Sequence, residues 1–315
     1  YLRRALAEYS PMSKDRRVYL TNTHFQSMKK GFKLSDHIWP FSTLQEHLSQ
    51  HGRTGGHYVQ TILNPYLKKV ALFIFMSARE KFVKRKGTFH IFGIDFMIDA
   101  AWHVWFIEAN GYPGYTWSIN FDTRSLVEEQ FNLVQQVHEN PRFYTHMVAG
   151  DRYGGFEMIF SEMEEERSQR AYNPCQEFKF NRGYTIPLKL ANRRFAKYSG
   201  AGGRTDKLKT FKNLISGSKG VGGHKGEVIM NQKRFFAKYK CNRDSLRYTP
   251  EAYLLYDPKD CNSFFNGGGV ASSMWVLKPV RAVGGKGVKL YKTKEELQSI
   301  YGSCQKRAPD FIVQK

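Results

Sequence analysis

The segment FGIDFMIDAAWHVWFIEANGYPG, residues 92–114, decides the predicted architecture. Apolar residues alternate along both of its halves, a pattern that predicts two antiparallel strands with one dry face. If Ala101 and Trp102 form a two-residue turn, Asp95 lies directly opposite Glu108. We therefore expect two carboxylates to face each other across the hairpin.

A third polar side chain joins this pair. Because side chains on a strand alternate between its two faces, Asn110 shares the face of Glu108. Like charges that face each other are unfavourable unless something compensates them, and a divalent cation does so. Mg²⁺ prefers oxygen ligands, usually one or two carboxylates together with waters and phosphates. Asp95, Glu108 and Asn110 are thus candidate metal ligands, although the same three residues also fit the solvated polar face of an edge hairpin.

The composition indicates a folded protein with a partner of opposite charge. The chain has 315 residues, of which 41% are hydrophobic and 15% aromatic, enough for two domains or one large enzyme. Its formal net charge is +21, and residues 181–240 hold 15 basic and 2 acidic residues. The positive electrostatic field of so many basic residues attracts nucleic acid, an anionic membrane or an acidic polypeptide. The alternative is a basic surface that is only solvated and has no specific partner.

The sequence gives no sign of export or of a bilayer span. The longest apolar run, residues 70–76, is too short to cross a membrane, and no secretory signal is visible. The four cysteines, Cys175, Cys241, Cys261 and Cys304, have no metal-binding spacing. We expect reduced thiols in a cytoplasmic protein.

Periodicity and turn signals outline the rest of the chain. We expect a strand over residues 15–25, helices over 39–52, 61–82, 125–140 and 156–170, and a terminal strand over 311–315. The helix of residues 61–82 is apolar over much of its circumference and should lie in the core. Near the end, a strand, a glycine loop, a second strand and a helix follow one another, and Thr293 with Glu296 forms a capping box at the start of that helix.

Two further groups of residues could hold an anion. Lys278 ends an apolar strand, and the loop that follows it contains Gly285, Lys286 and Gly287, whose backbone N–H groups could line a phosphate. A hairpin turn with a surface lysine is the alternative. Arg3 or Arg4, together with Asn22, could also reach a phosphate, unless they are ordinary surface and turn residues.

Taken together, these segments resemble the tubulin tyrosine ligase-like family of ATP-grasp ligases. The resemblance rests on LRRALAEY, VYLTN, FGIDFMID, WFIEANGYPG, WVLKP, GGKGV and FIVQK. It implies an α+β ATP-grasp fold, with antiparallel sheets, flanking helices and an ATP cleft between two lobes. It also implies ATP and Mg²⁺ as cofactors.

The resemblance assigns roles to single residues. Asp95, Glu108 and Asn110 would hold Mg²⁺. Arg3 would face the γ-phosphate, and Asn22 would lie near the phosphates. The remaining cofactor-binding residues, at the phosphates and the adenine, would be Lys278, Gly285, Lys286, Gly287, Gln314 and Lys315.

Three departures from the family pattern stand out. The Lys-Pro and glycine-loop half normally precedes the Asp/Glu-Asn half, whereas here it follows. The K-F-D-x-R segment of the family is absent, and Tyr19 replaces a usual histidine. The inversion has three explanations: a permuted domain, a rearranged order, or a fragment of two tandem domains. In a single domain Lys278 would lie near Asp95, whereas in a tandem fragment the two would lie far apart.

The predicted organisation and function follow from this resemblance. Residues 1–140 would form the C-terminal-type half of the domain, 141–227 a basic, glycine-rich connection, and 228–315 the N-terminal and central half. We expect a ligase that adds an amino acid, glutamate being the commonest choice, to the acidic tail of tubulin. Residues 181–240 would dock that tail at microtubules or in a cilium.

The alternatives are a glycine or tyrosine ligase, a non-catalytic family member that binds microtubules, and a nucleic-acid-binding protein. Charge alone supports the last of these.

Overall fold

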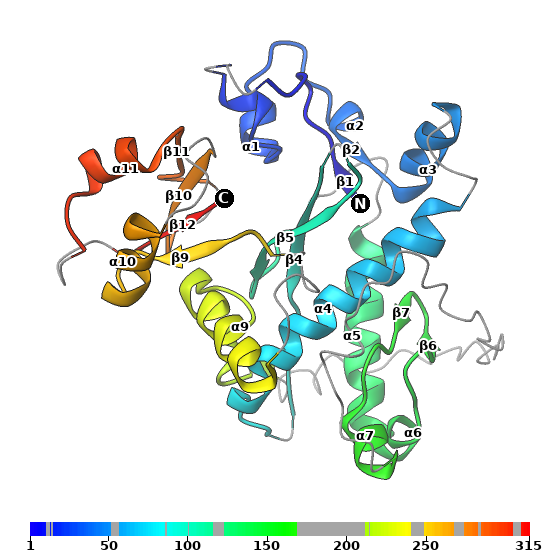
Figure 1. Ribbon diagram of the computed structural model, residues 1–315. Coiled ribbons are helices and arrows are strands. Elements are labelled where there is room, and N and C mark those ends of the chain that lie inside the picture. Colours follow the sequence, from blue (N-terminus) through cyan, green and yellow to red (C-terminus); the bar gives the residue numbers. More distant parts are fainter. Residues whose placement is uncertain are drawn as a thin grey trace.

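A computed structural model gives the fold of the chain (Figure 1). The structure describes residues 1–10, 13, 15–51, 57–85, 87–99, 101–115, 123–168, 212–213, 215–240, 249–267, 274–282, 285–304 and 310–315. None of the described helices is long and apolar enough to span a bilayer.

The strands are β1 (Leu2–Arg3), β2 (Ile38–Trp39), β3 (Thr88–Phe89), β4 (Gly93–Ile98), β5 (Val104–Asn110), β6 (Arg152–Tyr153), β7 (Phe156–Glu157), β8 (Lys212–Asn213), β9 (Ala252–Leu254), β10 (Trp275–Pro279), β11 (Lys289–Tyr291) and β12 (Phe311–Gln314). The α-helices are α1 (Thr23–Gln26), α2 (Leu34–His37), α3 (Phe41–Gln50), α4 (Asn64–Ala78), α5 (Thr123–Glu139), α6 (Pro141–Thr145), α7 (Glu162–Ser168), α9 (Lys225–Tyr239), α10 (Pro258–Asn266) and α11 (Lys294–Tyr301). The described part of the chain also contains the short helical turns η1 (Arg16–Val18), η2 (Val59–Leu63), η3 (Arg79–Lys81) and η5 (Ser218–Gly220).

Small sheets and helices make this an α+β fold, as predicted. The largest sheet has four antiparallel strands in the order β11-β10-β12-β9. The hairpin β4–β5 forms a second, two-stranded antiparallel sheet. Among the described strands, β3 and β8 pair in parallel.

Helix α4 lies in the core behind the hairpin, as its apolar circumference predicts. Val70, Phe73 and Ile74 are completely buried. They belong to a cluster that also contains Phe106 of β5 and Phe235 of α9. The rings of Phe73 and Phe235 meet edge to face at 5.1 Å, a favourable aromatic geometry. The hairpin therefore has a solid apolar support, which leaves its other face for polar groups.

The strand predicted over residues 15–25 is wrong. That segment forms η1 and α1 instead. Asp15 Oδ1 accepts a hydrogen bond from Arg17 N at 2.9 Å, and Asn22 Oδ1 accepts one from His24 N at 3.0 Å. Such local bonds from Asp and Asn satisfy the first N–H groups of a helical turn, and they outweigh the β-preference of the apolar residues between them.

The other predicted elements are found, with shifted ends. Helices occur within 39–52, 61–82 and 125–140, and residues 156–170 contain the short strand β7 before α7. The cap of α11 is formed as predicted: Thr293 Oγ1 accepts from Glu296 N at 3.1 Å, and Glu296 Oε2 accepts from Lys292 N at 2.9 Å.

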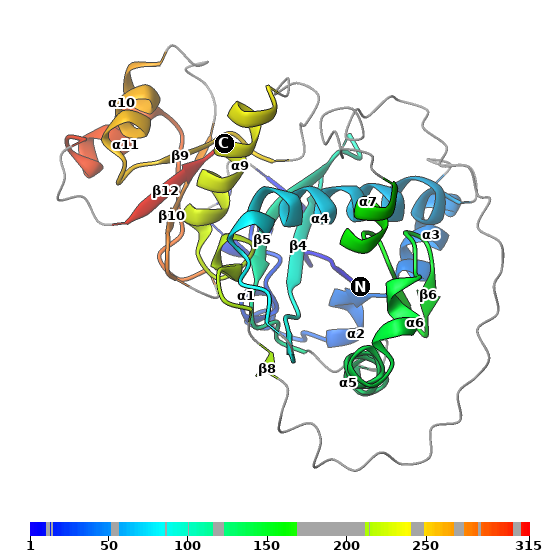
Figure 2. The same ribbon diagram turned by 90° about the horizontal axis from the view of Figure 1, so that it is seen from below.

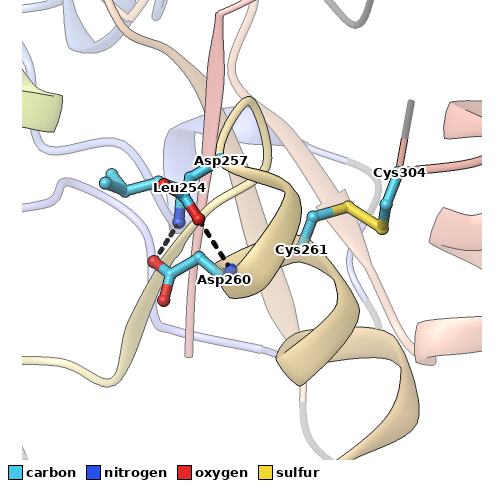
Figure 3. Close-up of a disulfide and its surroundings, with 5 residues drawn as sticks. All are labelled: Leu254, Asp257, Asp260, Cys261 and Cys304. Atoms are coloured by element: carbon cyan, nitrogen blue, oxygen red, sulfur yellow. Dashed lines mark hydrogen bonds between the residues drawn. A yellow bond between two sulfur atoms is a disulfide. The ribbon is translucent and has the colours of Figure 1, made fainter. Parts of the chain in front are cut away.

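The four-stranded sheet and helices α10 and α11 enclose a separate core. Its completely buried members include Phe264, Leu297 and Val313. A disulfide joins Cys261 of α10 to Cys304, just after α11 (Figure 3). The expectation of reduced thiols is therefore wrong for these two cysteines. They are 43 residues apart in sequence, and only the packing of α10 beside α11 brings them together.

Cys175 and Cys241 lie outside the described residues.

Helix α9 joins the two parts of the molecule. In both ribbon views it lies between the hairpin β4–β5 and the four-stranded sheet (Figures 1 and 2). Glycines allow the close approach at its start. A Cβ on Gly222 would lie 2.9 Å from Gly111 N, and a Cβ on Gly226 would lie 2.1 Å from the hydroxyl oxygen of Tyr256. The late half of the chain thus packs directly on the end of β5.

Candidate functional site

The hairpin places Asp95 opposite Glu108, as predicted, although its turn is different. Near the tip, Ile98 pairs with Val104, which makes the turn one residue longer than expected. Trp102 adopts a left-handed φ of 63° there. A register shift between Asp95 and Phe96 then restores the predicted pairing. The longer turn and the register shift offset each other, so Asp95 still lies opposite Glu108.

The three predicted metal ligands converge on one face. Asn110 Nδ2 donates to Asp95 Oδ2 at 3.3 Å. Burial raises the pKa of Asp95, and the Glu108 carboxylate raises it further, while the positive charge of Arg3 and the Asn110 hydrogen bond lower it. An ionised Asp95 is therefore unfavourable here without a cation.

Lys278, on β10, lies near this acidic face, close enough for Glu108 to raise its pKa. Lys278 Nζ donates to Gln314 Oε1 at 2.6 Å, which links β10 to the neighbouring strand β12. Burial lowers the pKa of Lys278 to about 8; the nearby Glu108 raises it, and the cation of Lys225 lowers it. A buried ammonium whose hydrogen-bond partner among the described residues is a neutral amide oxygen can receive an anion.

Lys225, at the start of α9, is a site residue that sequence reasoning missed. Its Nζ lies 3.2 Å from Glu108 Oε2 and donates to the carbonyl of Ala282 at 2.8 Å. It therefore bridges β5 and the segment that follows β10. The sequence places it in the basic region assigned to docking. Only the packing of α9 against β5 turns this lysine inward.

The glycine loop makes a tight turn beside α1. Gly285 and Gly287 have φ values of +72° and +73°, which favour glycine, and Val288 N donates to Gly285 O at 3.3 Å. Lys286 is exposed at its tip. A Cβ on Gly285 would lie 3.2 Å from the ring of Phe25. The loop is therefore held against the helix whose N-cap is Asn22.

The remaining predicted residues occupy three different environments. Arg3 lies close enough to Asp95 to lower its pKa, and its buried Nε atom has no partner among the described residues. Asn22 caps α1 through the bond to His24 N, the turn role that was its alternative. Lys315 is exposed and donates only its backbone N–H, to Glu251 O at 2.9 Å.

A cavity connects the two halves at this point. It is small, with a volume of about 30 Å³, and it is partly open to solvent. Its lining residues come from β5, α9, the segment before β9, and the sheet: Phe106, Ile107, Glu108, Ala109, Lys225, Val228, Ile229, Gln232, Thr249, Pro250, Ala252, Ile312 and Gln314.

The donor set of the acidic hairpin fits Mg²⁺. Among the residues that the structure describes, no group of three or more His, Cys, Asp or Glu side chains could hold a metal. Two carboxylates and the amide oxygen of Asn110 would therefore need phosphate or water oxygens to complete the shell, the arrangement that Mg²⁺ usually adopts.

Most of the basic region 181–240 lies outside the described residues. In its described part, the lysines of α9 form ion pairs with other elements. Lys233 pairs with Asp260 of α10, and Lys238 pairs with Glu80 of η3. Together with Lys225, these lysines fasten α9 to both halves of the molecule.

Antiparallel sheets, flanking helices and a small cavity between β5, α9 and β12 agree with the ATP-grasp class. Residues 1–139 match the model of the tubulin-tyrosine ligase family, which belongs to that superfamily. This part of the chain is therefore similar to the tubulin-tyrosine ligase family. The strand of Lys278 lies beyond the matched residues.

Several curated proteins are similar to parts of the chain. Tubulin glycylase 3A of Drosophila melanogaster is 32% identical over 118 residues, which is 36% of this chain and 12% of that protein. The human inactive polyglycylase TTLL10 is 29% identical over 119 residues, 36% of this chain and 18% of that protein. The human protein monoglycylase TTLL8 is 26% identical over 171 residues, 51% of this chain and 18% of that protein.

The matched parts thus span less than a fifth of the length of these relatives. No solved structure matches the chain.

Proposed function

We propose that this chain forms the catalytic site of an ATP-dependent carboxylate–amine ligase that adds glycine to tubulin. The family match supports the ligase class, and the relatives named above are tubulin or protein glycylases. Glutamate, the amino acid expected from the sequence, has no such support and gives way to the glycine alternative.

One observation carries the proposal: the two halves of the chain meet at the acidic hairpin. Glu108 of β5 forms an ion pair with Lys225 at 3.2 Å, and Lys278 of β10 is close enough for its pKa to respond to Glu108. Glu108 and Lys225 thus line one cavity, and Lys278 lies near enough for the charges of both to shift its pKa. Two unrelated modules of a tandem would not need to bring these residues together.

The residues of the chain have distinct proposed tasks. Asp95, Glu108 and Asn110 would hold Mg²⁺, which supplies positive charge against the phosphates when bound. Lys278 and Lys225 would neutralise the charge that develops on the transferred phosphoryl group. Positioning and charge neutralisation account for most of the catalysis in phosphoryl transfer.

The reaction has two steps, each with a balanced exchange of bonds. A carboxylate oxygen of tubulin attacks the γ-phosphorus of ATP, the bond to the β-phosphate oxygen breaks, and ADP leaves. The amine of glycine then attacks the acyl carbon, loses a proton, and displaces inorganic phosphate to give the amide. Arg3, which lies near Asp95 and whose Nε atom has no partner among the described residues, would contact the phosphoryl oxygens in the first step.

The acidic tail of tubulin is the proposed partner of the basic region 181–240. The net charge of +21 supports attraction of an acidic polypeptide. This partner would bring the protein to microtubules, with cilia as one possible location among microtubule structures.

Mass spectrometry of tubulin tests the proposal. The chain is incubated with tubulin, ATP and Mg²⁺, with glycine, glutamate or tyrosine supplied separately. We expect a mass increase with glycine alone, and its loss in the double variant Asp95→Ala with Glu108→Gln. That variant should also lose Mg²⁺-dependent ATP binding. Unchanged nucleotide affinity in it would refute the metal assignment.

A non-catalytic, microtubule-binding protein is the second candidate. Tyr19, which stands where the family usually has histidine, favours it. This candidate predicts binding to tubulin without a mass increase for any amino acid. Lys225→Met distinguishes the two: freeing Glu108 should tighten Mg²⁺ binding while it weakens binding of the ATP phosphates.

A further inference from the structure

His37, at the end of α2, is a completely buried residue that the site described above does not use. Its ring nitrogen Nδ1 lies 2.6 Å from the carbonyl oxygen of Arg4, and Nε2 lies 3.2 Å from the hydroxyl oxygen of Thr23. Because a carbonyl oxygen can only accept, Nδ1 carries the proton, and Nε2 of the neutral ring accepts from Thr23. Burial lowers the pKa of His37, the bond to Arg4 raises it, and the charge of Arg3 lowers it.

The first partner of His37 belongs to the strand of Arg3. Arg4 directly follows β1, and its backbone N–H donates to the His37 carbonyl oxygen at 2.8 Å. In the ladder of β1 and β2, Arg3 pairs with Ile38, the residue next to His37. The main chain and the ring of His37 therefore both bind Arg4, which fixes the direction of β1 where it carries Arg3.

The second partner belongs to helix α1, which supports the glycine loop. Thr23 begins this helix, and a Cβ on Gly285 would lie 3.2 Å from the ring of Phe25 in the same helix. Gln26 of α1 is also completely buried, and its Oε1 accepts from Leu6 N at 3.0 Å. Elements β1, β2, α1 and α2 lie together at the top of Figure 1. Buried polar contacts thus join the start of the chain to the helix beneath the loop.

This joint lies near the acidic hairpin. Arg3 is close enough to Asp95 to lower its pKa, and the buried Arg3 Nε has no hydrogen-bond partner among the described residues. Its Nη2 donates to the Tyr1 hydroxyl at 3.1 Å, an exposed contact. A long side chain contributes most to binding when its backbone is already held, because ordering it on binding costs free energy. His37 supplies that support from within the core.

We propose that His37 is a positioning residue, which holds β1 so that the Arg3 guanidinium meets the terminal phosphate of ATP. The inference rests on the proposed ATP-dependent function. It predicts a selective effect, because ADP lacks the terminal phosphate: loss of His37 should weaken binding of ATP but not of ADP. A histidine that only stabilised the fold would change the two affinities alike.

Calorimetric titration with Mg²⁺-ATP and with Mg²⁺-ADP tests the inference. In His37→Phe, which fills the space but loses both ring hydrogen bonds, ATP affinity should fall about tenfold, and ADP affinity should change less than about twofold. His37→Asn keeps an amide donor near the position of Nδ1, so it should recover most of the lost ATP affinity. If His37→Phe does not unfold cooperatively, Thr23→Val gives the same comparison, because it leaves the imidazole in place and removes the hydroxyl that orients it.

A double-variant cycle shows whether His37 acts through Arg3. Arg3→Met removes the guanidinium, and adding His37→Phe to it should lower ATP affinity by less than about twofold. Equal losses from His37→Phe in the presence and absence of Arg3 would overturn the inference. A parallel loss of ATP and ADP affinity would overturn it as well.

His51→Phe is the matched control, because His51 is an exposed histidine just after α3 whose Nδ1 bonds to the His47 carbonyl oxygen. It should bind both nucleotides like the unmodified chain. Failure of the unmodified chain to bind ATP would overturn the proposed function. An unmodified chain that binds ATP, with an unchanged ATP-to-ADP affinity ratio in His37→Phe and Thr23→Val, would overturn the role of His37 alone.

Discussion

The low pKa of Lys278 makes ATP binding depend on pH in a calculable way. Burial holds this pKa at about 8 in the free protein, whereas a bound triphosphate keeps the ammonium charged. A group with a lowered pKa loses its proton at lower pH than usual, so ATP affinity is highest below pH 8 and falls as pH rises through that value. Phosphate groups titrate near pH 6 and contribute little above neutrality.

The magnitude follows from the protonated fraction of Lys278. With a pKa of about 8, this fraction is roughly nine-tenths at pH 7 and roughly one-tenth at pH 9. Because binding requires the charged form, affinity for Mg²⁺-ATP should fall about tenfold between these values, or about 1.4 kcal/mol. Isothermal titration calorimetry at pH 7, 8 and 9, at constant ionic strength, measures the change.

The variant Lys278→Arg is the matched control. The arginine side chain stays charged throughout this range, so the variant should show a flat pH profile whatever its absolute affinity. An unmodified chain whose affinity varies less than twofold from pH 7 to 9 would refute the reasoning. So would a Lys278→Arg variant with the same slope, since the titrating group would then lie elsewhere.

Two further predictions concern stability. Cys304→Ser should lower the free energy of unfolding by about 2–4 kcal/mol, because the disulfide to Cys261 closes a long loop. Reduction of the unmodified chain should cause the same loss in thermal unfolding. Equal melting temperatures with and without reductant would contradict this prediction. Gly226→Ala should lower the free energy of unfolding by about 1–3 kcal/mol, because its Cβ would lie 2.1 Å from the Tyr256 hydroxyl oxygen. Adding Tyr256→Phe should recover most of that loss. Denaturant unfolding of the single and double variants measures both changes, and equal losses in the two variants would show that the hydroxyl is not the obstacle.

The sequence predicted the part of the site that depends on local pattern. Alternation along residues 92–110 placed Asp95, Glu108 and Asn110 on one face, and the structure gives the same pairing. Period-two patterns report the faces of a hairpin because the two strands are covalently close. The apolar helix α4 was predictable for a similar reason, since its burial pattern is visible along one segment.

Contacts between distant segments were not predictable in this way. Lys225 and Gln232 look like members of a basic, polar region, and only the docking of α9 on β5 turns them toward the cavity. The Cys261–Cys304 bond likewise depends on the packing of two helices. For Asn22 the local sequence is sufficient: its side chain caps the helix that follows it, so its position needs no contact with a distant segment.

The register shift beside Asp95 separates the hairpin into two parts that can change independently. A one-residue slip in an uninterrupted hairpin moves every side chain to the other face. Here the extra residue on β5 absorbs such a slip, since the tip and the acidic end follow different registers. Insertions and deletions at the tip can therefore accumulate during evolution while the spacing of the carboxylates stays constant.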